Sequence, residues 1–131
     1  MSIQLTEKQM PYLGELMGYI KQIEGVMGEQ VSTSDLNSLS YQLAKACTLL
    51  ALQGRIMELA SALYDYAKGE AVKQVNKDLK LELLRLELSA LLSVHSARFE
   101  RAERVVKGLT TYIDGLRTLI SAEKELTKNL Q

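Results

Sequence analysis

The chain has 131 residues, of which 16 are basic and 16 are acidic, so it carries no formal net charge at pH 7. This length is typical of one domain that buries about two thirds of its unfolded surface, and a single domain over residues 1–131 is predicted. The balanced charge disfavours generic binding to nucleic-acid phosphates or to an anionic membrane, because any electrostatic attraction must come from a local patch.

The rest of the composition narrows the class of protein. One cysteine excludes an internal disulfide, and no uninterrupted apolar run reaches the roughly 20 residues of a membrane span. Residues 1–20 contain no basic stretch followed by an apolar leader, so the predicted location is a reducing cytoplasm. One proline, no tryptophan and an apolar content of 47%, rich in leucine and alanine, favour an all-α protein with few turns.

The first helix is predicted over residues 6–28. Thr6 is suited to cap its first turn, and Glu7 lies favourably against the helix dipole. Pro11 then lies slightly too deep to be free of cost, which leaves a kink or a later start at Met10 as alternatives. Its main apolar stripe consists of Leu13, Leu16, Met17, Ile20, Ile23 and Met27.

The opposite side of this helix carries an unusual glycine face. Gly14, Gly18 and Gly25 project close to one another beside Lys21. Each internal glycine costs about 1 kcal/mol of helix propensity relative to alanine. One interpretation is a flat face that permits close approach of another helix, from a second copy, or of a ligand. The other is that Gly25 and Gly28 end the helix and that the remaining glycines are tolerated.

A second helix is predicted over residues 34–68, after a loop. Ser34 and Asp35 form a start signal, and no helix breaker follows until Gly54. Two apolar stripes run along it, displaced by one position, so the helix is predicted to face different neighbours along its length. The stripes are Leu36, Leu39, Leu43, Ala46 and Leu50, and then Leu49, Leu52, Ile56, Leu59, Leu63 and Tyr66.

A turn is predicted within residues 69–76, and a third helix over residues 77–128. This helix contains LKLELLRLELSALL at residues 79–92, in which eight of fourteen residues are leucine. Leucines alternate with charged residues at the start of this segment, as in a half-buried strand. The alternation ends at Leu83 and Leu84, however, and the segment has no β-branched residues, so a helix is predicted. On a helix, one side carries Leu79, Leu83, Leu86 and Val94, and the other carries Leu81, Leu84, Leu88, Leu91 and Leu92. Such a helix is predicted to be surrounded by other helices.

Heptad spacing resumes beyond a charged stretch at residues 95–104. It runs through Val105, Leu109, Tyr112, Leu116, Leu119, Leu126 and Leu130. Because the register is unbroken through Gly108 and Gly115, one long helix is predicted, with a bend near Gly108 as an alternative. Three to four helices then predict an elongated helical bundle, dominated by an antiparallel hairpin of the second and third helices. Since the first two helices cover the third incompletely, a homo-oligomer is predicted.

Signatures of catalysis and metal binding are missing from the sequence. It contains no Glu-x-x-His pair, no second histidine, no cysteine pair and no glycine-rich phosphate loop. His95 is predicted to be a structural residue rather than an acid or base. The sequence therefore predicts a protein that is not an enzyme and that needs no cofactor or metal.

The densest charged patch contains Arg98, Arg101, Arg104 and Lys107. One interpretation is a solvated helix turn, because Glu100 and Arg104, like Glu103 and Lys107, have the favourable four-residue spacing. The sharper interpretation is that the three arginines share one side of the helix and hold a phosphate or a partner's carboxylates. Phe99 would then offer a stacking ring to a single-stranded nucleic acid.

Two segments carry a resemblance to a known group of proteins. The segments LYDYAKGEAVKQ (63–74) and YIDGLRTLISAEKE (112–125), in a short all-helical chain, resemble small proteins encoded in phages and prophages, often near recombination or single-strand annealing genes. The resemblance covers about half of the chain. It implies no catalytic or binding residues, so it indicates a genomic setting more than an activity.

The predicted function is therefore that of a non-enzymatic, phage-type accessory or interaction protein. It is predicted to be oligomeric and to act in DNA recombination or replication through an unidentified protein partner, without contact with a membrane. One alternative is direct binding of single-stranded nucleic acid at Arg98, Arg101 and Arg104. Another is an anti-defence protein that sequesters a signalling nucleotide or blocks a host protein, with the glycine face or a subunit interface as its pocket.

Overall fold

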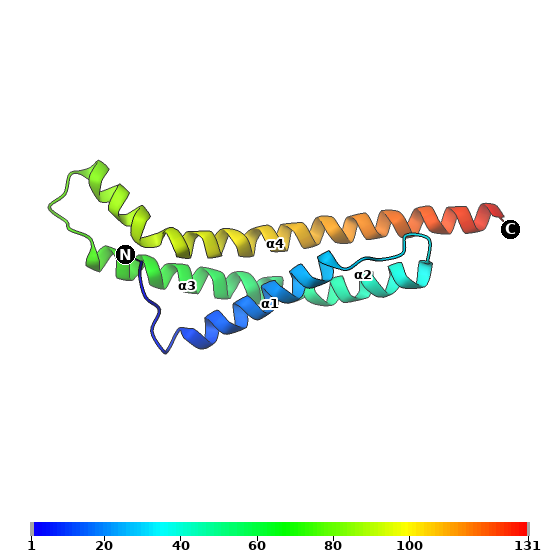
Figure 1. Cartoon of the computed structure of the whole chain (residues 1–131), viewed down its shortest axis with the longest axis horizontal. Helices are drawn as coiled ribbons and strands as arrows, with labels where there is room; N and C mark the ends of the chain where they lie inside the picture. Colours follow the sequence, from blue (N-terminus) through cyan, green and yellow to red (C-terminus); the bar gives the residue numbers. More distant parts are fainter. Residues whose placement is uncertain (1, 131) are drawn as a thin grey trace. The chain divides into compact units, whose positions relative to one another are not determined.

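The computed structural model describes residues 2–130, which form four α-helices and no strand (Figure 1). The helices are α1 (Met10–Gly28), α2 (Leu36–Leu50), α3 (Gln53–Gln74) and α4 (Leu81–Leu130). The predicted all-α class, with three to four helices, is confirmed. The elongated hairpin arrangement stays a prediction.

Two compact units make up the described residues. Unit 1 contains residues 2–17 and 55–103, and unit 2 contains residues 18–54 and 104–130. Helices α1 and α4 each contribute residues to both units. Unit 1 therefore combines the start of α1, nearly all of α3 and the first half of α4, whereas unit 2 combines the end of α1, α2 and the second half of α4.

Helix α1 begins at Met10, so the predicted start at residue 6 is wrong and the alternative later start is correct. The Thr6 carbonyl accepts hydrogen bonds from the amides of Gln9 and Met10 at 3.0 and 3.1 Å, which form a turn before the helix. Pro11 is then the second helical residue. Its missing N–H costs nothing in the first turn, because those amides have no intrahelical partner.

Asp35 caps α2, as its start signal predicts. Its Oδ1 accepts hydrogen bonds from the amides of Asn37 and Ser38 at 3.0 and 3.4 Å, and its Oδ2 accepts one from the Ser38 hydroxyl at 2.8 Å. These bonds, led by the one from the Ser38 hydroxyl, lower the pKa of the Asp35 carboxyl. The carboxylate thereby satisfies amides that the first turn leaves without partners.

The single helix predicted over residues 34–68 is wrong, because the chain breaks between α2 and α3. The Ala51 amide still donates to the Cys47 carbonyl at 3.1 Å, but the Leu52 amide turns to the Leu49 carbonyl at 3.0 Å. The break explains why the two apolar stripes are displaced by one position, because they belong mainly to different helices. Helix α2 buries Leu39, Gln42 and Ala46, and α3 buries Ile56, Leu59, Ala60, Leu63, Ala67 and Ala71.

Helix α3 continues past the predicted end at residue 68, through Gly69 to Gln74. Ala67 lies two residues before the glycine and Ala71 two residues after it, and both are completely buried in a cluster with Ile3 and Leu91. Burial of both alanines keeps this turn helical, and outweighs the cost of about 1 kcal/mol for an internal glycine.

Helix α4 begins at Leu81 rather than at residue 77 and runs to Leu130 as one helix. Asn76 accounts for the later start, because its side-chain oxygen accepts a hydrogen bond from the Asp78 amide at 3.0 Å and closes a turn. The helix passes through Gly108 and Gly115 without interruption, as the heptad register predicts.

The leucine-rich start of α4 is covered on one side only, so the prediction that helices surround it is wrong for the single chain. Leu91 is buried, and its neighbours on that side, Leu84, Leu88 and Leu92, are half-buried. The other side is open to solvent: Leu83 is 51% exposed, Leu86 66% and Val94 54%. The spacing of the leucines shows that this part of α4 has two apolar sides, but the other residues of unit 1 cover only one of them.

The second half of α4 buries a stripe next to the predicted heptads. Val105, Leu109 and Leu116 are buried as predicted, but Ile113 and Ile120 are buried in place of Tyr112 and Leu119. Leu126 and Leu130 are exposed by 58% and 88%. The last turns of α4 therefore lack the cover that their spacing predicts.

Candidate functional site

The open side of α4 in unit 1 is the first candidate surface. We define the α4 stripe as Leu83, Leu86, Ala90, Val94 and Ala97, all of which are exposed. Spacings of three and four residues place them on one side of the helix. Exposed Glu82, Ser89 and Ser93 border the stripe. An apolar centre with a polar rim is the usual composition of a protein interface.

The predicted glycine face has open space beside it in the described chain, where Gly14 and Gly25 are exposed and Gly18 is half-buried. A Cβ atom built on Gly14, Gly18 or Gly25 would meet no atom within 4 Å. No element of residues 2–130 therefore uses these positions for close packing. Lys21 and Gly25 instead line an open groove between α1 and α2 in unit 2, about 470 Å³ in volume, together with Val26, Glu29, Lys45 and Leu49.

Substituting Gly25 by alanine is expected to raise the free energy of unfolding by about 1 kcal/mol. The methyl group enters open space, and alanine is the better helix former. Chemical denaturation of the variant and the parent protein measures the difference. Gly28→Ala, at the last residue of α1, is the matched control and is expected to gain less, since the helix ends there. A destabilised Gly25→Ala variant would contradict an open glycine face.

The predicted arginine patch is divided between the two units. Arg98 and Arg101 belong to unit 1 and are half-buried, whereas Arg104 and Lys107 belong to unit 2 and are exposed. Phe99 packs against Tyr64, with ring centroids 5.5 Å apart, so its ring is used inside unit 1. Binding of single-stranded nucleic acid at these residues stays a hypothesis.

His95 links Arg98 to the segment that precedes α1. Its Nε2 lies 2.7 Å from the Ile3 carbonyl oxygen, which accepts a hydrogen bond, so Nε2 carries the proton. Its Nδ1 then accepts a hydrogen bond from Arg98 Nη1 at 3.1 Å. His95 is 3% exposed, and its structural role stays a prediction. Burial lowers the pKa of Arg98.

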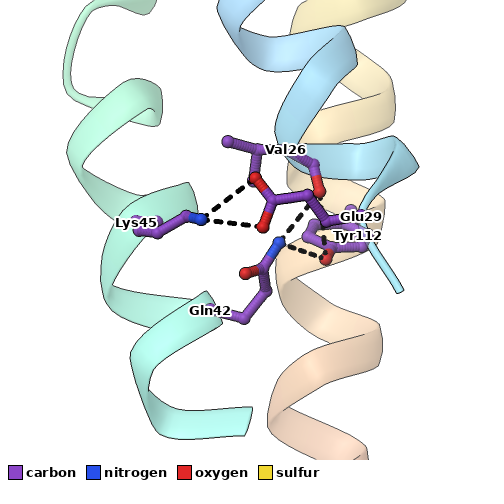
Figure 2. Close-up of polar contacts among 5 residues, drawn as sticks. All are labelled: Val26, Glu29, Gln42, Lys45 and Tyr112. Carbon is purple, nitrogen blue, oxygen red and sulfur yellow. Dashed lines mark hydrogen bonds and ion pairs between the residues drawn. The ribbon is translucent and has the colours of Figure 1, made fainter. Parts of the chain in front are cut away.

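Gln42 is a buried polar residue that the sequence analysis missed. It is 3% exposed, and its Nε2 donates to the Val26 carbonyl at 2.9 Å and to the Tyr112 hydroxyl at 3.0 Å (Figure 2). Nearby, Lys45 Nζ pairs with Glu29 at 2.7 Å, and this hydrogen bond raises the pKa of Lys45. The burial of Gln42 could have been predicted from its position, because it follows the apolar residue Leu39 by three positions and so lies on the same side of α2.

Within residues 2–130, no group of three or more His, Cys, Asp or Glu side chains is placed to hold a metal ion. No single helix of the described chain has the length and apolar content to cross a membrane, although α2 and α3 taken together, across the bend between them, pass the same test. Comparisons with protein-family models, with curated protein sequences and with solved structures found no match to this chain.

Proposed function

We propose that this protein is a non-enzymatic interaction protein that self-associates through the α4 stripe. The observation that carries the proposal is the exposure of Leu83, Leu86 and Val94, each more than half open to solvent on one side of a helix. A soluble chain that exposes such a row gains free energy when another apolar surface covers it.

The free energies gained and lost on association favour an assembly that depends on protein concentration over a permanent one. Burying one leucine side chain contributes about 1.5–3 kcal/mol. Bringing two chains together costs at least about 4 kcal/mol in lost translational and rotational freedom. Leu83 is 51% exposed and Leu86 66%, so a two-fold dimer that covers both in each copy gains about 3.5–7 kcal/mol, which is close to the lower end of that cost. The expected assembly is a dimer that dissociates on dilution.

The assembled protein would act by presenting helix surfaces to a partner. The resemblance to phage-encoded proteins supports a partner from DNA recombination or replication in a host cytoplasm. The balanced charge of 16 basic and 16 acidic residues supports a protein partner over a nucleic acid, because it provides no long-range attraction for phosphates.

The test is the molar mass measured by light scattering over a wide range of protein concentration. The parent protein is expected to shift from monomer to dimer as its concentration rises. Leu86→Lys is expected to remain a monomer, because the dimer would bury an unpaired charge. Val72→Lys is the matched control: Val72 is also exposed, by 52%, but lies on α3 and is not part of the stripe.

The control variant is expected to dimerise like the parent protein. Circular dichroism verifies that both variants keep their helix content. A parent protein that is monomeric at every concentration contradicts the proposal. So does a Leu86→Lys variant that dimerises as well as the Val72→Lys control.

A further inference from the structure

A second surface of unit 1 has a different chemistry from the α4 stripe. It is a groove of about 370 Å³ between the segment preceding α1, the start of α1 and α4. Its apolar lining consists of Ile3, Leu5, Met10, Leu13 and Val94. Met10 is 51% exposed, and Leu5 and Leu13 are half-buried, so the groove presents apolar side chains to solvent. This volume lies in the range of small-molecule sites.

Arg98 is the only charged residue that lines this groove in the described chain. The guanidinium is half-buried and, within residues 2–130, no carboxylate lies at ion-pair distance from it. A partly desolvated cation without a counter-ion is unfavourable, and an anion placed beside it recovers that free energy. The groove therefore has a positive end that its own lining leaves uncompensated.

His95 fixes the position of this cation. Its Nε2–H is held by the Ile3 carbonyl, so its Nδ1 is available to accept the hydrogen bond from Arg98 Nη1. A guanidinium has five N–H donors, of which this contact uses one. The remaining donors suit a carboxylate, which an arginine binds through two parallel hydrogen bonds. His95 thus acts as a positioning residue for Arg98.

We infer that this groove binds a small carboxylate that carries an apolar tail, with the carboxylate on Arg98 and the tail along Met10, Leu13 and Val94. The inference does not depend on self-association, although Val94 belongs to both surfaces. Binding to the Leu86→Lys variant separates the two, because that substitution lies outside the groove.

The probes are decanoate, decanol and decylamine, which share one tail and differ in the head group, and acetate, which has the head group alone. All are used below their micelle concentrations and followed by isothermal titration calorimetry. Decanoate is expected to bind saturably, one per chain. Decanol is expected to bind at least tenfold more weakly, which corresponds to about 1.4 kcal/mol for the lost charge-assisted bond. Decylamine and acetate are expected not to bind.

Arg98→Gln is expected to weaken decanoate binding at least tenfold, and Arg98→Lys is expected to restore part of it, since lysine keeps the charge but not the paired donors. Arg104→Gln is the matched control, because Arg104 is exposed in unit 2, and it is expected to bind like the parent protein. Circular dichroism and the thermal midpoint verify the fold of each variant.

Methionine methyl resonances locate the ligand independently of the variants. The chain has five methionines, and of these Met10 alone is a groove residue in the described range. Decanoate is expected to shift the Met10 methyl signal and to leave that of Met27, in unit 2, unchanged. Equal binding of decanol and decanoate, an Arg98→Gln variant that binds like the parent protein, or shifts at Met27 without shifts at Met10 would each overturn the inference.

Discussion

Substituting Leu63 by alanine is expected to lower the free energy of unfolding by about 2–5 kcal/mol. Leu63 lies on α3 in unit 1 and is 2% exposed, so the substitution leaves a cavity in a packed interior. Because small proteins are stable by only about 5–15 kcal/mol, this loss is a large share of the total. Urea denaturation followed by far-ultraviolet circular dichroism measures it.

The matched substitution in unit 2 is Ile113→Ala, on α4, which is also 2% exposed. Comparing the two variants tests the predicted single domain, because α1 and α4 each pass through both units. In one cooperative domain, both variants shift a single transition. Two transitions, with Leu63→Ala moving one and Ile113→Ala moving the other, would show two domains instead. A loss below 1 kcal/mol for Leu63→Ala would contradict its burial.

Substituting Gln42 by leucine is expected to cost about 1–3 kcal/mol, although leucine is the more apolar residue. The substitution removes the donor to the Val26 carbonyl and to the Tyr112 hydroxyl in the interior of unit 2 (Figure 2). Val26 lies in the last turn of α1, and its carbonyl also accepts hydrogen bonds from the Glu29 amide at 3.3 Å and from the Tyr112 hydroxyl at 3.5 Å. Gln42 makes the shortest of these bonds to Val26 and a second bond to Tyr112, and the loss of both, at about 0.5–1.5 kcal/mol each, gives the expected cost.

Tyr112→Phe is the control for the Gln42 prediction. It removes the hydroxyl but leaves the bond between Gln42 Nε2 and the Val26 carbonyl at 2.9 Å. Its cost is therefore expected to be smaller than that of Gln42→Leu, as thermal denaturation can determine. A Gln42→Leu variant as stable as the parent protein would show that apolar packing replaces the lost donor.

Local features of the fold were predictable from the sequence. Spacings of three and four residues identify the helices, Asp35 identifies the start of α2, and the unbroken register identifies α4 as continuous. The break at residues 51–52 was not predicted, because both flanking stripes are helical and only their one-position displacement distinguishes them. The continuation of α3 through Gly69 depends on tertiary burial of Ala67 and Ala71, which local propensity cannot reveal.

The candidate surfaces were less predictable. The sequence identifies two apolar sides at the start of α4, but which side is covered depends on where the rest of unit 1 packs. The groove at Arg98 depends on His95 and Ile3, which are 92 positions apart. The local run of charges placed Arg98 in a patch with Arg101, Arg104 and Lys107, either as a solvated helix turn or as an anion site, but could not show that Arg98 is half-buried and hydrogen-bonded to His95. Spacing along one helix cannot report such long-range partners.

The distance along the chain between Ile3 and His95 has a consequence for synthesis. The Ile3 amide and carbonyl are both bonded to α4, at the Leu91 carbonyl and at His95 Nε2. A ribosome must therefore release most of the nascent polypeptide before the first residues have their partners. Until then, Ile3 and the α3 alanines in its cluster, Ala67 and Ala71, are not yet covered by Leu91. Unit 1 is therefore expected to complete its folding only after the leucine-rich turns of α4 have left the ribosome.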